Sequence, residues 1–460
     1  MVLSPGSHGV IVIHGIGDNM KRGDLLADLT NSLADALMES RSHGKDPKIR
    51  RDVNLDGTPP SVTLNITSPT GEKAIWVCKE AFWDDAFPAP KAANVLWWLL
   101  KQNLRNQIKF IFEGITKDPA NDGFINQKDM KYERKRHPGQ QPWTAKKYQK
   151  VSCSKLSFKS LLLSLGLFLL VPFTYLVLLL VWLCHYLPSV GPLESILKLI
   201  RKLDPFLSNS LGDVEKYIEH GVWSGNARAR LENIVIAMLN DQYGEVKDIT
   251  IIAHSMGCVV TYDTLAEGGK VAEEVKCLES LGKGKKISFV SVGSGINQVF
   301  RLARKSSSYA QEQFKRSLAK EITGYEEGGK KQNQTLEDKF FWLDICARRD
   351  PVPAGNITDD IVKQARIDPE QQLKRRRVIC TDNILFDHTS YWANKDIVIP
   401  RIARAINGGT EYPWPEAGIT RQKIINRLKL AARFGWITNA AILVILGVCA
   451  IVVLKLVGII

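Results

Sequence analysis

Short apolar runs recur in two parts of the chain and alternate with segments of helical character. Runs of this length, rich in β-branched residues, are typical of strands that are buried on both faces of a sheet. They predict β-strands near residues 9–13, 62–66, 74–80, 248–253, 287–292, 340–346 and 376–380. Strands that alternate with helices indicate an α/β fold with a mainly parallel sheet and helices on both faces. We therefore predict one folded domain formed by residues 1–90 and 220–410.

Two apolar stretches are much longer than these strands. Residues 160–193 contain no Asp, Glu, Lys or Arg, and residues 434–454 form a second uncharged run. About 20 consecutive apolar residues suffice to span a bilayer. Basic residues precede the second run, which favours a cytosolic position for its upstream end. We predict that residues 434–460 form a C-terminal transmembrane anchor and that the folded domain lies on the cytosolic face of a membrane.

The first long stretch interrupts the series of predicted strands. Strands on both sides of it must form one sheet, so the chain has to return to the side of the membrane from which it entered. In a helix, the 34 residues from 160 to 193 cover about 50 Å, which is less than two spans of about 30 Å each. Pro172 in the middle can break a helix. We predict that residues 88–220 form an insertion, with a membrane hairpin at about 158–187 and an amphipathic segment after it.

One predicted strand leads into a motif that carries chemistry. Residues 248–253 run into Ala-His-Ser-Met-Gly at positions 253–257, and a helix is expected to follow. A nucleophile elbow has this context of strand, turn and helix, and its tight turn needs small residues two positions before and after the serine. Ala253 and Gly257 meet this requirement, although glycine is more usual at the first position. The sequence predicts Ser255 as a nucleophile, with an ordinary turn that contains a serine as the alternative. Because side chains around such a turn diverge, His254 is expected to point away.

A second motif follows the first predicted strand. There the chain continues as His-Gly-Ile-Gly at positions 14–17, which resembles the oxyanion-hole loop of lipases. Glycine in such a loop allows a backbone N–H to turn toward a substrate oxygen. We expect the backbone amides of Ile16 and Met256 to be the two donors. His14, Gly15 and Gly17 are expected to shape the loop. A phosphate-binding loop is the alternative, but the chain has no Gly-x-x-x-x-Gly-Lys-Ser/Thr pattern.

The remaining members of a catalytic triad are expected after two late strands. Asp350 follows the strand near 340–346 and is the best candidate for the acid that orients an imidazole. His388 follows the strand near 376–380 and is the candidate general base. Three further acids remain open as alternatives to Asp350, namely Asp344, Asp382 and Asp387.

The chain order Ser255, Asp350, His388 is that of the α/β-hydrolases. The sequence resembles this superfamily over roughly residues 1–90 and 220–410, and it is most similar to membrane-associated lipases and hydrolases like the GPI inositol-deacylases. The resemblance implies a serine esterase that uses neither a metal nor an organic cofactor. The resemblance also implies a shortened sheet, because the chain begins at the oxyanion-loop strand and the two leading strands of larger superfamily members are then absent.

Charge and cysteine content narrow the range of partners. The formal net charge of +14 favours an anionic surface as partner. Because no zinc-finger or RNA-binding signature is present, we expect a lipid bilayer and no nucleic acid. The eight cysteines form no Cys-x-x-Cys pair, so neither a disulfide framework nor a zinc site is expected.

Together these features predict a serine hydrolase that cleaves a carboxylic ester through an acyl-enzyme on Ser255. The two long apolar stretches favour a membrane lipid as the substrate. Two alternatives remain open: an acyltransferase that uses the same triad, and a membrane scaffold that keeps the hydrolase fold without catalysis.

Overall fold

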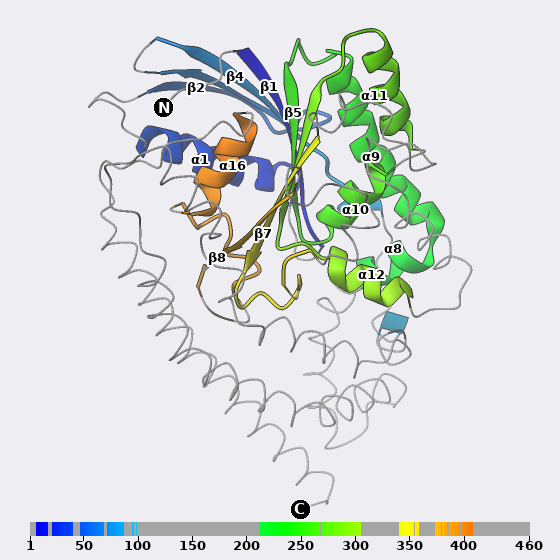
Figure 1. The fold of residues 1–460 in the computed structure, drawn as a ribbon. Helices are drawn as coiled ribbons and strands as arrows, with labels where there is room; N and C mark the ends of the chain where they lie inside the picture. The colour runs from blue at the N-terminus through cyan, green and yellow to red at the C-terminus, as the bar shows by residue number, and fades with distance from the viewer. Residues whose placement is uncertain are drawn as a thin grey trace, which may run out of the picture.

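The structure is a computed structural model of the chain, and it describes the following residues: 6–16, 21–39, 47–68, 71–86, 94–95, 98, 212–266, 269–304, 340–353, 355–357, 373–378, 380–381, 383, 386–395 and 397–407. These residues form a central sheet with helices on both faces (Figure 1).

The sheet of the described residues has eight strands in the order β2-β3-β4-β1-β5-β6-β7-β8. Of these eight strands, only β3 runs in the opposite direction to the others, so the sheet is mainly parallel, as predicted. The strands are β1 (Gly6–Ile13), β2 (Lys48–Asn54), β3 (Ser61–Thr67), β4 (Lys73–Glu80), β5 (Asp248–His254), β6 (Lys286–Val292), β7 (Phe340–Ala347) and β8 (Leu373–Val378).

The helices are divided between the two faces of the sheet (Figure 1). On one face lie α1 (Asp24–Glu39) and α16 (Val398–Ile406). The other face is covered by α8 (Gly212–Glu219), α9 (Gly221–Leu239), α10 (Gly257–Thr264), α11 (Lys270–Ser280) and α12 (Ile296–Arg304). A short 3-10 helix, η1 (Asp84–Ala86), follows β4 and contacts α9.

The second half of β1 shows why the central strands contain apolar runs. Side chains alternate between the two faces of a strand, so a strand covered on both sides buries every residue. Val10 and Val12 pack with α1 and α16, whereas Ile11 and Ile13 pack with α9 and α10. All four side chains are fully buried. Burial of each such side chain stabilises the fold by about 1.5–3 kcal/mol.

All seven predicted strands are present, but the edge of the sheet differs from the prediction. Strand β2 was not expected, because its sequence Lys-Ile-Arg-Arg-Asp-Val-Asn is polar and its side chains are mostly exposed. Together with β3 it forms the edge beside β4, although both strands follow β1 in the chain. Within the described residues, the sheet therefore has one strand more than the seven that the sequence predicted. At the other edge, β8 starts at Leu373, earlier than predicted. The sequence did not reveal this start because the first half of the strand is mostly polar and partly exposed.

Among the residues that the structure describes, no helix is both long enough and apolar enough to cross a membrane. The predicted hairpin at 158–187 and the predicted anchor at 434–460 lie outside these residues. Of the predicted insertion at 88–220, the structure describes residues 94–95, 98 and 212–220. The membrane segments therefore stay predictions.

Candidate active site

The predicted site residues follow the carboxyl ends of β1, β5, β7 and β8. These four strands are parallel, so their carboxyl ends lie along the same edge of the sheet, where open α/β sheets bind their ligands. The sequence places the loop at 14–16 after β1, Ser255 after β5, Asp350 after β7 and His388 after β8.

Ser255 occupies a tight turn between β5 and α10. Its φ of 53° lies in the left-handed region, which is uncommon for a residue other than glycine. The turn is held by the Ser255 amide, which donates to the Val292 carbonyl at 3.1 Å, and by the Ser255 carbonyl, which accepts from the Gly295 amide at 3.0 Å. A strained backbone of this kind costs about 1–3 kcal/mol and persists only where surrounding contacts fix it. Ser255 thus lies in a strained turn between a strand and a helix.

Two glycines allow the loop after β1 to pack directly on this turn. A Cβ atom on Gly257 would lie 2.4 Å from the His14 carbonyl oxygen, and one on Gly15 would lie 2.5 Å from the Cβ of Ser255. Both distances are too short for any side chain. Gly15 is not among the residues with positive φ, so this position requires glycine for close approach rather than for backbone freedom. Ala253, the other predicted small residue, is fully buried.

His14 fixes the loop after β1 through both of its ring nitrogens. Nδ1 lies 2.6 Å from the Gly15 carbonyl oxygen, and Nε2 accepts from the Trp83 amide at 3.2 Å. The indole N–H of Trp83 donates to the His14 carbonyl at 2.9 Å, and the two rings are stacked. Burial lowers the pKa of His14 to about 4, so the ring is neutral near pH 7. His14 and Trp83 therefore hold the loop after β1 in place.

The two predicted oxyanion donors have amides available for a ligand. Within the described part of the chain, neither the Ile16 amide nor the Met256 amide donates a hydrogen bond to another residue. Met256 lies at the start of α10, where the helix dipole favours negative charge. A Cβ on Gly295 would lie 3.8 Å from the Met256 nitrogen, so a glycine borders this amide. Gly17 lies outside the described residues.

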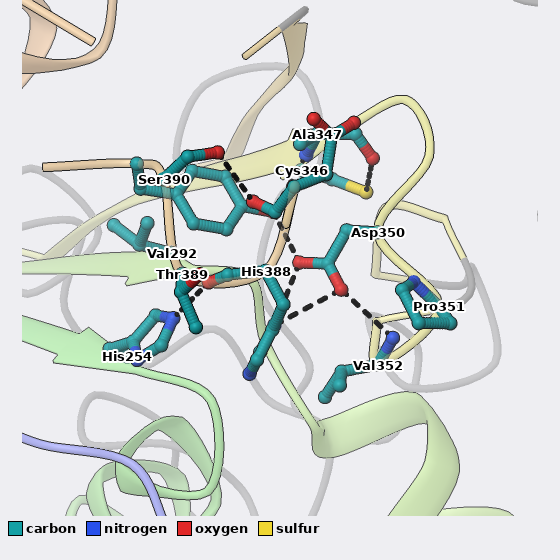
Figure 2. A network of polar contacts seen from close by, with 12 residues as sticks. His254, Val292, Cys346, Ala347, Asp350, Pro351, Val352, His388, Thr389 and Ser390 are labelled. Atoms are coloured by element: carbon teal, nitrogen blue, oxygen red, sulfur yellow. Dashed lines mark hydrogen bonds and ion pairs between the residues drawn. The ribbon is translucent and has the colours of Figure 1, made fainter. Parts of the chain in front are cut away.

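His388 and Asp350 form a partly buried hydrogen-bonded pair (Figure 2). Nδ1 of His388 lies 2.9 Å and 3.0 Å from the two carboxylate oxygens of Asp350, whose side chain is fully buried. The carboxylate also accepts from the Val352 amide at 2.9 Å and from the Tyr391 hydroxyl at 2.6 Å. These contacts fix the acid, and they leave Nε2 of His388 on the side of the ring that faces away from Asp350.

The alternative acids that the structure describes have other partners. Asp344 accepts from the Ser291 hydroxyl at 2.7 Å and the Ile357 amide at 3.0 Å, and burial raises the pKa of its carboxyl. Asp387 accepts from the amide and hydroxyl of Thr381, both at 2.7 Å, and so braces the turn that carries His388. Asp382 lies outside the described residues.

Sequence reasoning missed three residues that contact the histidine–aspartate pair. Tyr391 donates to Asp350 while its oxygen accepts from the Ala347 amide at 2.7 Å. Gly293, with a φ of 58°, makes room for the pair, because a Cβ there would lie 3.0 Å from Asp350 Oδ2 and 3.3 Å from His388 Nδ1. The third is His254, which contacts His388 rather than pointing away from the site. Only the position of His254 beside Ser255 hinted at a role.

Among the described residues, no group of three or more His, Cys, Asp and Glu side chains is arranged to hold a metal ion. No family model, curated protein or solved structure matches the chain.

Proposed function

We propose that the protein is a serine hydrolase of the α/β-hydrolase type and that it cleaves a carboxylic ester. One observation carries the proposal. Ser255 has a left-handed conformation at the turn between β5 and α10, on the same edge of the sheet as the pair formed by His388 and Asp350. An ordinary turn has no need of this strained conformation, whereas a nucleophile elbow does.

In the proposed mechanism, Ser255 Oγ attacks the ester carbonyl carbon while His388 Nε2 accepts the hydroxyl proton. Asp350 keeps Nδ1 protonated and stabilises the imidazolium that forms. The amides of Ile16 and Met256 donate to the oxyanion. His388 then gives its proton to the departing alcohol, which leaves an acyl group on Ser255. Water, deprotonated by His388, attacks this acyl group and releases a carboxylic acid and the free serine.

The proposed substrate is a membrane lipid, with the catalytic domain on the cytosolic face. Support comes from the sequence: the uncharged stretches at 160–193 and 434–454 and the net charge of +14 favour a protein that works at an anionic bilayer. A soluble ester would give no reason for two apolar segments. Neither a metal nor an organic cofactor takes part in the proposed reaction.

A fluorophosphonate probe, which reacts with activated serines, tests the proposal directly. The full-length protein should be labelled and should hydrolyse a short-chain p-nitrophenyl ester. Ser255→Ala should lose labelling and on the order of 10⁶-fold in kcat, the usual effect of removing a triad nucleophile. Ser280→Ala, at the exposed end of α11, is the matched control and should behave like the wild type.

Residual turnover above a tenth of the wild-type value in Ser255→Ala would contradict the assignment of the nucleophile. A wild-type protein that the probe does not label would instead support a scaffold without catalysis. Labelling followed by transfer of the acyl group to an added alcohol, with no free acid released, would identify the acyltransferase.

A further inference from the structure

We infer that His254 is a positioning residue that holds the main chain of His388 and links it to the loop after β1. The inference rests on the proposed function, because it assigns a role within the same site. His254 is the last residue of β5 and directly precedes Ser255, so its backbone is part of the rigid sheet. Any group that it holds is therefore fixed relative to the serine.

The contact between His254 and His388 involves the backbone of His388. Nε2 of His254 donates to the His388 carbonyl oxygen at 2.9 Å (Figure 2). The two imidazole rings are also stacked, with centroids 4.7 Å apart and planes inclined by 29°. Because His254 binds the carbonyl, it occupies neither ring nitrogen of His388. Nδ1 stays with Asp350, and Nε2 stays available for Ser255.

The other side of the His254 ring faces the loop after β1. Its Nδ1 atom lies 3.3 Å from the position that a Cβ on Gly15 would occupy. Tyr391 and Trp392 contact the ring edge-on, with centroids at 5.9 Å and 5.7 Å. One imidazole therefore packs between the predicted oxyanion loop and the turn that carries the base. If either segment shifts, the geometry between base, nucleophile and oxyanion donors changes.

The charge state of His254 suits this role. Burial, together with the neighbouring His388, lowers the pKa of His254 to about 3. His254 thus stays neutral when His388 becomes an imidazolium, and a second cation at stacking distance is avoided. Among the residues that the structure describes, the ionisable side chains that contact His388 are the Asp350 carboxylate and the neutral His254 ring, and the Tyr391 hydroxyl acts through Asp350. A neutral residue that donates to a carbonyl can position the base without competing for its proton.

Two substitutions separate the hydrogen bond from the packing. His254→Phe keeps a ring of similar size but removes the donor, whereas His254→Gln keeps an N–H donor for the carbonyl. We expect His254→Phe to lower kcat for a p-nitrophenyl ester on the order of 10- to 100-fold with KM unchanged, the effect of misplacing a catalytic group. His254→Gln should recover part of this loss. kcat is expressed per serine titrated with the fluorophosphonate, so that unfolded protein does not contribute.

The matched control is His8→Gln. His8 is also fully buried and also makes a hydrogen bond, from Nδ1 to Asp248 at 2.6 Å, but it lies near the amino end of β1, away from the site. His8→Gln should lower the melting temperature without changing kcat per titrated serine. His254→Phe should change kcat by far more than its melting temperature explains.

A spectroscopic measurement decides the inference without a substrate. The Nδ1 proton of His388, shared with the buried Asp350, should give a downfield proton resonance that disappears in His388→Ala. We expect His254→Phe to broaden this resonance or shift it upfield, and His8→Gln to leave it unchanged. Should His254→Phe retain both kcat and the resonance and lose only thermal stability, His254 is a core residue and the inference is wrong. An inactive wild type refutes the proposed function, whereas the resonance still reports on His254.

Discussion

At the scale of single residues, the candidate site needs glycines, which have no Cβ atom, as much as it needs its polar side chains. Gly15, Gly257 and Gly293 each lie where a Cβ would come within 3.0 Å of another site atom. Because these glycines have no side chain, their backbones pack directly against the turn of Ser255 and the pair of His388 and Asp350. The strained φ of Ser255 persists because the same contacts surround it.

The contacts of Asp350 predict a ranking among the triad variants. His388→Ala removes the proposed base and should lower kcat on the order of 10⁶-fold. Asp350→Asn keeps the shape but favours the wrong tautomer of His388, so we expect a loss on the order of 10⁴-fold. Asp387→Asn should lose less, because Asp387 braces the turn without touching the imidazole. Steady-state kinetics at saturating ester give the ranking. If Asp350→Asn is silent and Asp387→Asn is inactive, the acid must be reassigned.

At the scale of elements, a buried carboxylate joins the end of β4 to the start of α1. Glu80 is almost fully buried and accepts a hydrogen bond from the Gly23 amide at 2.5 Å, one residue before α1 begins. Burial raises the pKa of Glu80 to about 7, more than the hydrogen bond from Gly23 lowers it. A folded-state pKa above the unfolded value means that the folded state binds the proton more tightly. The contribution of Glu80 to the free energy of unfolding is therefore largest below the unfolded pKa, and it is lost as the pH rises through 7.

Glu80→Gln should therefore change the pH dependence of stability. The neutral amide keeps an acceptor for Gly23 and removes the titration, so the variant should lose less stability than the wild type between pH 5 and pH 8. A pKa raised from 4.5 to about 7 corresponds to a difference on the order of 3 kcal/mol. Urea unfolding at both pH values measures it, with the exposed Glu72→Gln as the control. Parallel pH profiles for Glu80→Gln and wild type would refute this account.

The strands that could be predicted from the sequence are those that bury side chains on one or both faces of the sheet. The second half of β1 is a continuous apolar run, and β3 alternates between buried and partly buried positions, so both carry a recognisable strand pattern. Strand β2 lies at an open edge, and its exposed side chains carry no periodic signal. Burial supplies the pattern from which a strand is predicted, so a strand with little burial is missed.

The site shows a similar limit. Ser255, Asp350 and His388 were predicted because each follows a recognisable strand. His254 and Tyr391 were not, because their roles depend on contacts between segments far apart in the chain. His254, for example, binds a carbonyl 134 residues away. Without the packed structure, neither residue differs from an ordinary core aromatic.

At the scale of the whole molecule, strands from both sides of the long apolar stretch share one sheet. β1 lies between β4 and β5, so the strands before the long apolar stretch and the strands β5 to β8 after it lie on the same side of any membrane. We expect Gln140, Ser210 and Arg421, which lie outside the described residues, to share that side as well.

Deleting residues 434–460 should weaken membrane binding without abolishing it, because the predicted hairpin remains.

Single-cysteine labelling in sealed vesicles, on a cysteine-free background, tests this topology. Cysteines at positions 140, 210 and 421 should react alike with a membrane-impermeant maleimide, and Leu281→Cys, exposed in the folded domain, serves as the reference for that side. Opposite accessibility at 140 and 210 would contradict the hairpin.

The pairing of β1 with β5 also has a consequence for how the protein is made. His8 on β1 bonds to Asp248 on β5, 240 residues later in the chain. At typical rates of synthesis, roughly 10 to 50 s separate the two strands as they leave the ribosome. During that interval one edge of β1 has no partner strand and is prone to aggregate, so the nascent chain should need a chaperone to shield it. Because His388 is made later still, a ribosome-bound chain that ends before it carries the serine turn without the proposed base.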